Sequence, residues 1–199
     1  MLPLALFEAV RGLDIPPGAE LDEFHRELTS KRLGTSPTVA AQIARYTRLV
    51  HEGRTVGADE FVAVLRLIGR RNDSHLVFTD GGRRAGRHAV RLTWAAARMG
   101  ARVLPGRLGE GAGFRLARGA VRRVFAFDLA REGGVLGGRL PGSLATQATP
   151  DGAACGFYGS AVAEVLRAFT TFDGAMIHTQ CRARRNEVCR WRAATGTEE

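Results

Sequence analysis

Two of the three cysteines in the chain lie close together, in the stretch HTQCRARRNEVCRW (178–191). If a turn is centred near Arg185, the strands of a hairpin place Cys181 and Cys189 directly opposite each other, with Cβ atoms ~4.5–5.5 Å apart. Two thiolates at that separation can bind one zinc ion with Zn–S bonds of ~2.3 Å. A disulfide, or two small buried apolar side chains, would also account for the pair. The spacing alone leaves these three interpretations open.

Cys155 and His178 are the candidates for a third and a fourth metal ligand. Cys155 begins a stretch predicted to be helical, and a helix start lowers the pKa of a thiol and so favours the thiolate that a metal needs. His178 lies three residues before Cys181, and residues three apart on a regular strand point to opposite faces. A bulge or strand end near Thr179 is therefore required. The alternatives are a surface histidine or, without metal, a Cys155 nucleophile with His178 as its base.

The composition bounds the class of protein and its compartment. A chain of 199 residues with 45% hydrophobic and 25% charged residues is typical of one soluble globular domain, with or without a helical extension. No apolar run approaches the ~18 residues of a membrane span. The start, MLPLALFEAVRG, lacks the basic region and cleavage site of a signal peptide. We therefore expect a cytoplasmic protein whose three cysteines stay reduced, which argues against a structural disulfide.

The charge raises the question of nucleic-acid binding. The net charge is +9 and the isoelectric point is about 11.0, but Lys31 is the only lysine among 29 basic residues. DNA-binding modules usually concentrate their basic residues on one helix or stripe. In this chain the arginines are spread over every region. We interpret them as a solvated basic surface and do not expect a nucleic-acid partner. Nucleic-acid binding remains an alternative that rests on charge alone.

Hydrophobic periodicity predicts an α+β fold, with helices first and hairpins later. Ser36 and Pro37 have the types expected at the cap and first turn of a helix. The alternation of Phe125, Phe127 and Leu129 predicts a strand, preceded by a turn at Arg118-Gly119. Helices are expected at 19–34, 36–53, 57–71, 82–99 and 153–172, an irregular connection at 131–152, and the strands of a closing hairpin at 174–183 and 187–194.

Four motifs point to a known family. They are DGGRRAGRHAVRL (80–92), GAVRRVFAFDLA (119–130), CGFYGSAVAEVLRAF (155–169) and HTQCRARRNEVCRW (178–191). With them, the C-terminal half resembles the 4-vinyl reductase domain family, whose fold is shared with a class of TRAPP trafficking subunits and with heme-NO-binding domains. The resemblance covers roughly residues 80–194 and implies a ligand-binding domain at 76–195, with a small antiparallel sheet packed against helices. The helical region before it, 1–75, would then serve dimerisation or coupling. A disordered tail is expected at 196–199.

The resemblance also implies a zinc site. In the family's aromatic-sensing members, three cysteines and a glutamate hold one zinc ion. Carried onto this sequence, the cysteines become Cys155, Cys181 and Cys189, and the glutamate position falls on His178. Histidine is an equally good zinc ligand. In this chain Cys155 directly precedes Gly156-Phe157, whereas several residues separate the corresponding positions in the family. Four protein ligands would make the zinc structural.

An apolar pocket between helices and sheet is the other implied feature, with a small hydrophobic or aromatic ligand as its occupant. His88 is a candidate polar anchor, and Arg83, Arg84 and Arg87 could hold a carboxylate. Each aromatic residue has plain core packing as its alternative. The candidate lining residues are Trp94, Phe114, Phe125, Phe127, Phe157, Tyr158 and Phe169.

These expectations favour a zinc-containing, non-enzymatic ligand-binding or sensory module that works as a homodimer or through a protein partner. The alternative is an accessory or reductase-associated protein of (bacterio)chlorophyll or tetrapyrrole biosynthesis. Reductase chemistry has little support, because no dinucleotide fingerprint follows a strand. Ser160 lies in a predicted helix and in no G-x-S-x-G setting, so we do not expect a serine hydrolase.

Overall fold

The computed structural model describes residues 1–14, 36–93, 106–132 and 134–195. Over these residues the protein is α+β, with seven α-helices and one four-stranded antiparallel sheet. The elements in chain order are α1 (Leu2–Asp14), α3 (Pro37–His51), α4 (Ala58–Ile68), α5 (Ser74–Arg91), α7 (Gly106–Phe125), β1 (Asp128–Glu132), β2 (Val135–Leu140), α8 (Ala145–Ala148), the 3₁₀ turn η2 (Ala153–Cys155), α9 (Gly156–Phe169), β3 (Gly174–Gln180), the 3₁₀ turn η3 (Arg182–Arg184) and β4 (Cys189–Thr195).

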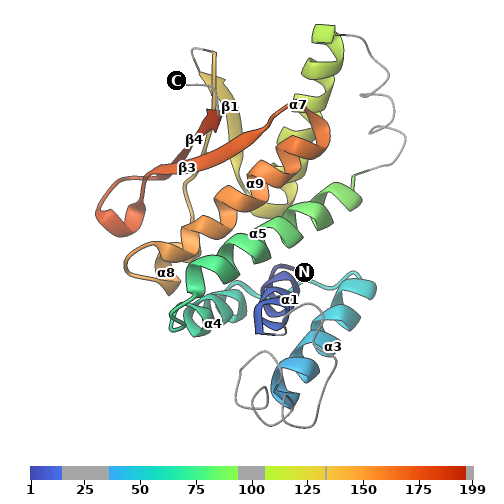
Figure 1. Ribbon diagram of the computed structural model, residues 1–199, viewed down its shortest axis with the longest axis vertical. Coiled ribbons are helices and arrows are strands. Elements are labelled where there is room, and N and C mark those ends of the chain that lie inside the picture. Colours follow the sequence, from blue (N-terminus) through green and yellow to red (C-terminus); the bar gives the residue numbers. More distant parts are fainter. Residues whose placement is uncertain (15–35, 94–105, 133, 196–199) are drawn as a thin grey trace.

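The elements form successive layers (Figure 1). The sheet packs against α9 and α7, α9 packs along α5, and α5 packs on α1, which in turn contacts α3 and α4. One continuous core of buried side chains runs through these layers. Leu6 and Val10 of α1 are fully buried in it, so the N-terminal region shares its interior with the rest of the chain. No helix among the described residues is long and apolar enough to cross a membrane.

The sheet has the order β1-β2-β4-β3, so the last strand in sequence lies between β2 and β3. The closing hairpin predicted from the sequence is confirmed as β3 and β4. Its register shifts between His178 and Gln180, where a β-bulge interrupts the pairing. The bulge lies at Thr179, the position at which the sequence required one.

Helix α5 begins at Ser74, eight residues before the predicted start, and ends at Arg91. Glycine has a low helix propensity, but the glycines of α5 let neighbouring elements approach closely. A Cβ atom at Gly82 would overlap the backbone carbonyl of Phe157, and one at Gly86 would lie 2.6 Å from the carbonyl oxygen of Ala161. The small residues thus form the contact surface for α9.

The predicted turn at Arg118-Gly119 is wrong, because α7 continues through it to Phe125. Ala117, Val121 and Phe125 are buried at intervals of four, which is the helical period. The positive φ of 54° at Ala126 then ends the helix. The predicted strand therefore begins only at Asp128.

The region 131–152 is not irregular as predicted, since it contains β2 and α8. Glycines inside strands are uncommon, and β2 contains Gly137 and Gly138. The sequence pattern therefore did not predict a strand here. Here Gly138 is required by packing, because a Cβ atom would overlap the ring of Phe127.

The predicted helices at 36–53 and 57–71 are confirmed as α3 and α4. Ser36 caps α3, accepting a hydrogen bond from the backbone N–H of Val39 at 3.3 Å. The predicted helix at 19–34 and the tail at 196–199 lie outside the described residues.

Candidate metal centre

Four potential metal ligands converge where the closing hairpin meets the start of α9. One ligand atom from each of Cys155, His178, Cys181 and Cys189 lies within 4.8 Å of the others. The three cysteines are buried with free thiols, and His178 is half-buried. In a tetrahedral site with Zn–S bonds of ~2.3 Å, sulfur atoms lie about 3.8 Å apart. The four side chains therefore fit one metal ion, and the structure brings together all four residues predicted from the sequence.

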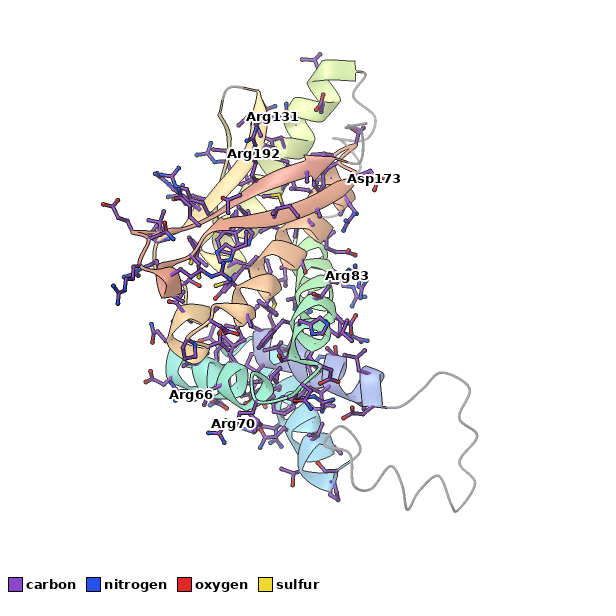
Figure 2. The ribbon with its side chains drawn as sticks, turned by 60° about the vertical axis from the view of Figure 1, so that its left-hand side comes forward. Arg66, Arg70, Arg83, Arg131, Asp173 and Arg192 are labelled. Atoms are coloured by element: carbon purple, nitrogen blue, oxygen red, sulfur yellow. The ribbon has the colours of Figure 1, made fainter. Side chains whose placement is uncertain are left out.

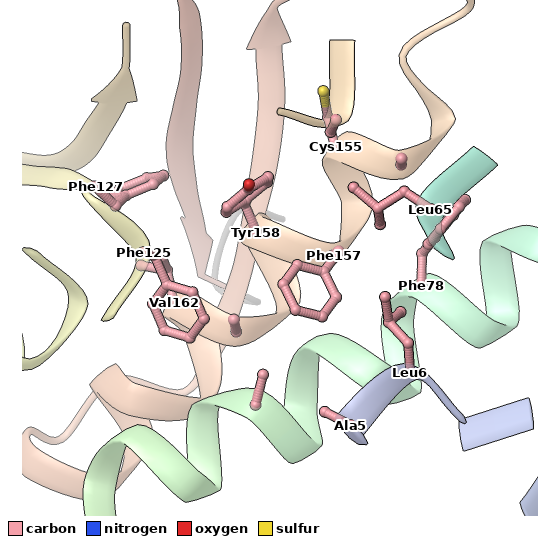
Figure 3. Close-up of a cluster of buried hydrophobic side chains, with 14 of the residues drawn as sticks. Ala5, Leu6, Leu65, Phe78, Phe125, Phe127, Cys155, Phe157, Tyr158 and Val162 are labelled. Atoms are coloured by element: carbon pink, nitrogen blue, oxygen red, sulfur yellow. The ribbon is translucent and has the colours of Figure 1, made fainter. Parts of the chain in front are cut away.

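The loop before α9 presents Cys155. It is the last residue of η2, and its backbone N–H donates to the carbonyl of Gly152 at 3.0 Å. Thr149 accepts the N–H of Ala154 through its hydroxyl at 3.1 Å, which fixes the loop. Figure 3 shows Cys155 at the start of α9, with its sulfur turned away from the apolar cluster that contains Phe157 and Leu65.

The bulge in β3 sets the orientation of His178. Its ring stacks on Trp191, with ring centroids 4.5 Å apart and an interplanar angle of 19°. Its Nε2 is buried and has no hydrogen-bond partner among the described residues. A metal ion bound at this nitrogen would satisfy it, since neutral imidazole is a common metal ligand.

The turn between β3 and β4 wraps the two hairpin cysteines. The backbone N–H of Arg182 donates to the Cys189 sulfur at 3.5 Å. Asn186 donates from its side-chain amide to the carbonyl of Cys181 at 3.0 Å. Arg185 has a φ of 67°, in the left-handed region, which closes the turn. A backbone N–H aimed at a buried sulfur favours its thiolate form, because it stabilises negative charge.

Gly152 makes room for Cys181. A Cβ atom at this glycine would lie 2.6 Å from the Cys181 sulfur, and its φ of +76° is one that other residues rarely adopt. The Pro-Asp-Gly turn at 150–152 signals a left-handed glycine, but nothing in the sequence links this turn to Cys181. The sequence likewise does not predict Ser143 as a neighbour of the site, although its buried hydroxyl lies 4.0 Å from the Cys155 sulfur.

Burial keeps the thiols of the site protonated in the absence of a bound cation. Burial raises the pKa of the Cys155 thiol, and the neighbouring sulfurs of Cys189 and Cys181 raise it further. Burial also raises the pKa of Cys189. Burial, followed by the charge of Arg184, lowers the pKa of His178 and so favours the neutral imidazole that binds metals. Cys155 and Cys189 can ionise together only with a compensating positive charge, which a bound metal would supply.

The aromatic candidates for a ligand pocket lie mainly in the core. Phe157 is fully buried and contacts Phe125 and Tyr158 through its ring edges, at centroid distances of 6.4 and 5.5 Å (Figure 3). Phe127 is also fully buried and packs on Trp191 at 5.2 Å. These rings therefore pack in the hydrophobic core. Phe114 and Phe169 are partly buried at the margin of the core, and Trp94 lies outside the described residues.

The arginine cluster predicted to hold a carboxylate is partly occupied by the protein's own acids. Arg84 forms an ion pair with Asp80 at 2.7 Å. Arg87 lies 3.4 Å from the carboxylate of Glu164 on α9. Arg83 is exposed. Arg84 therefore pairs within α5, and only Arg87 joins α5 to α9.

An apolar hollow that the sequence did not reveal lies at the end of the helical layers. Its volume is about 500 Å³. His88, half-buried on α5, contributes to its wall, and burial lowers the pKa of that imidazole. Apolar parts of the lining come from Leu2, Pro3, Val56, Phe61, Leu92, Val124 and Leu144.

Comparison with family models, with curated proteins and with solved structures finds no match for this chain.

Proposed function

We propose that the protein is a zinc-clipped, non-enzymatic domain that binds an apolar small molecule, as the 4-vinyl reductase domains it resembles do. The observation that carries the proposal is the convergence of three cysteine sulfurs and one histidine nitrogen within 4.8 Å. Sulfur and imidazole are the ligands that zinc prefers. The free Nε2 of His178 and the backbone donor at Cys189 support the same assignment.

A structural role for the zinc follows from the ligand count. Four protein ligands complete a tetrahedral shell and leave no position for water or substrate. The zinc would tie the loop before α9 to both strands of the closing hairpin. The alternative of a Cys155 nucleophile has little support, because this thiol is fully buried and burial raises its pKa.

The apolar hollow is the binding site that we propose for the small molecule. Its volume of about 500 Å³ lies within the usual range of ligand pockets, roughly 300–1,000 Å³. His88 offers a neutral imidazole as the polar anchor. Phe61 lines the hollow and also packs edge-on against Phe157 at 5.8 Å. The buried aromatic cluster would thus form the rigid floor behind the ligand.

The first experiment measures metal content by mass spectrometry on protein purified without chelators or metal-affinity resin. We expect about one zinc per chain, and none in Cys181→Ser, because three ligands bind zinc far more weakly than four. Ser143→Ala is the control, since it changes a neighbour of Cys155 without removing a ligand. A wild-type protein without metal would refute the zinc assignment.

The second experiment tests the hollow with the apolar dye N-phenyl-1-naphthylamine, whose fluorescence rises in apolar surroundings. Leu92 lines the hollow and is 55% exposed, so Leu92→Glu introduces a charge there without disturbing the core. Leu108 is 69% exposed on α7 and lines no part of this hollow, so Leu108→Glu is the matched control. We expect only Leu92→Glu to abolish dye binding. Equal dye binding by both variants would show that the dye does not bind in this hollow.

A further inference from the structure

The strands carry an open basic face on the side opposite the helices. Along β4, buried Cys189 and Trp191 alternate with exposed Arg190 and Arg192. The helices contact the face that bears the buried residues, since a Cβ atom at Gly159 of α9 would lie 3.1 Å from the indole nitrogen of Trp191. Arg190 and Arg192 therefore point away from α9. We call the side of the sheet that carries them the outer face.

The register adds a third arginine to the outer face. Arg139 of β2 pairs directly with Arg190, and Gly137 pairs with Arg192. Like charges opposite each other across two strands destabilise a sheet. Asp128 is the acid nearest to Arg139, at 3.8 Å. Neither Arg190 nor Arg192 forms an ion pair with any residue that the structure describes, so this face has an excess of positive charge.

The outer face is also hollowed. A depression of about 470 Å³ spans β1, β2 and β4, and Arg118 of α7 borders it beside the three strand arginines. Ala130 and Gly137 lie opposite each other and form a low strip within it. The small side chains lie between long arginine side chains and leave space for a helix. The guanidinium groups on both sides of this space can donate hydrogen bonds to it.

We propose that this outer face binds an acidic amphipathic helix of a partner protein. Guanidinium groups form bidentate hydrogen bonds with carboxylates. Arg190 and Arg192 are two positions apart on a strand, which corresponds to ~6.6–6.8 Å. Glutamates at i and i+4 of a helix have Cβ atoms ~5–6 Å apart, so they meet the two arginines in turn. A helix also provides the second layer that an uncovered sheet face otherwise lacks.

Single-stranded nucleic acid suits this face less well. Proteins that bind single strands place aromatic rings on the sheet for base stacking. The outward positions of the four described strands hold no phenylalanine, tyrosine or tryptophan, and Trp191 is buried on the other side. Their largest apolar side chain is Ile177, which is 50% exposed and fits the apolar side of a helix.

The test uses fluorescence anisotropy at about 0.15 M salt, where long-range attraction is largely screened. The probe is a fluorescein-labelled amphipathic helical peptide with glutamates at successive i and i+4 positions; its glutamine analogue and labelled oligo(dT) are the comparison probes. Arg190→Gln/Arg192→Gln removes two charges from the outer face. Arg70→Gln/Arg83→Gln removes the same number from exposed positions on the helical side (Figure 2). Equal unfolding midpoints establish that the variants are folded.

We expect the glutamate peptide to bind the wild type, and the outer-face variant to bind it about tenfold more weakly, a difference of about 1.4 kcal/mol. The control variant should stay within about twofold of the wild type. Three results would overturn the proposal. They are no peptide binding up to about 1 mM, equal weakening in both variants, or tighter binding of oligo(dT) that is lost in the outer-face variant. The last result would identify a nucleic-acid surface.

Discussion

At the hairpin end of the molecule the interior contains three thiols and an imidazole, whereas the layer of α1, α3 and α4 buries mainly aliphatic and aromatic side chains. Each region also buries polar groups, but it treats them differently. In the helical layer, the carboxylate of Asp14 is 5% exposed and accepts hydrogen bonds from Arg71 at 3.0 and 2.7 Å. At the hairpin end, Nε2 of His178 has no hydrogen-bond partner among the described residues.

This difference indicates that the hairpin end, and not the helical layer, requires a ligand such as a metal ion to satisfy its buried polar atoms. A buried polar atom without a partner costs free energy, roughly 1–3 kcal/mol. The helical layer satisfies its buried charge internally, so its stability is encoded in its own side chains. The hairpin end leaves a lone pair and three sulfurs facing one another, which a metal ion would satisfy together. The two regions should therefore respond differently to the same perturbation.

Metal removal should separate the two regions most strongly. Removal of the proposed zinc with a chelator should destabilise the protein by several kcal/mol, because metal binding contributes directly to folding. Hydrogen exchange should then rise in β3, β4 and the segment 143–155, which contains α8 and η2, while α1 and α3 stay protected. Cys181→Ser should reproduce this pattern without chelator. Equal loss of protection in both regions would show that they unfold as one unit.

The contact between α5 and α9 should be the next most sensitive feature. Gly82→Ala places a methyl group against the backbone of Phe157, and overpacking of this kind costs about 2 kcal/mol. Gly119→Ala is the matched control, since Gly119 is exposed within α7 and its Cβ atom would meet nothing within 4 Å. This control should gain about 0.5–1 kcal/mol. Thermal unfolding measures both, and zinc content should stay at the wild-type level. Zinc loss in Gly82→Ala would couple the metal site to this contact.

A comparable effect is expected where the helical layer satisfies its own charge. Arg71→Gln leaves the nearly buried carboxylate of Asp14 with weaker partners and should cost about 2 kcal/mol. Arg54→Gln is the control, because the Arg54–Glu52 pair is exposed and such pairs contribute little, about 0–1 kcal/mol. Denaturant unfolding compares the two. An equal loss of unfolding free energy in both variants would show that the buried Arg71–Asp14 pair contributes no more than an exposed pair.

The mildest probe is alkaline pH. Burial raises the pKa of Tyr46 to about 12, and its hydrogen bond to Glu60 acts in the same direction. Because the folded-state pKa lies above the unfolded value, the stabilisation is fully present below about pH 10. It is lost as the pH rises through about 12. Absorbance at alkaline pH should show no Tyr46 ionisation before unfolding begins, with Tyr46→Phe identifying the signal. Ionisation at about pH 10 in the folded protein would contradict the burial argument.

The sequence predicted the cluster of potential metal ligands better than it predicted the elements around it. The cysteine spacing and the requirement for a bulge at Thr179 depend on local strand geometry, which a sequence carries directly. The boundaries of α5 and α7 depend on long-range packing instead. Gly82 is a weak helix former until the backbone of α9 lies against it, and Gly138 is a weak strand residue until the ring of Phe127 occupies the space above it. The reason for a glycine at these positions is a tertiary contact, which the sequence pattern does not show.

The candidate site shows the same division between local and long-range information. Cys181, Cys189 and His178 lie within one hairpin and could be placed from sequence. Gly152, which makes room for the Cys181 sulfur, is distant in sequence and was missed. The aromatic residues could be recognised as apolar, but periodicity does not distinguish a pocket wall from a packed core. The hollow beside Phe61 is built from five helices and loops, so no single stretch reveals it.

The strand order has a consequence for how the protein is made. Because β4 lies between β2 and β3, a growing chain emerging from the ribosome cannot close its sheet until residues 189–195 have been synthesised. Until then β2 and β3 each expose an unpaired edge, which is a template for association with other chains. Cys189 is the first residue of β4, so capture of a metal ion by this cysteine would coincide with insertion of the missing strand. Availability of the metal during synthesis would then govern how long the nascent protein remains prone to aggregation.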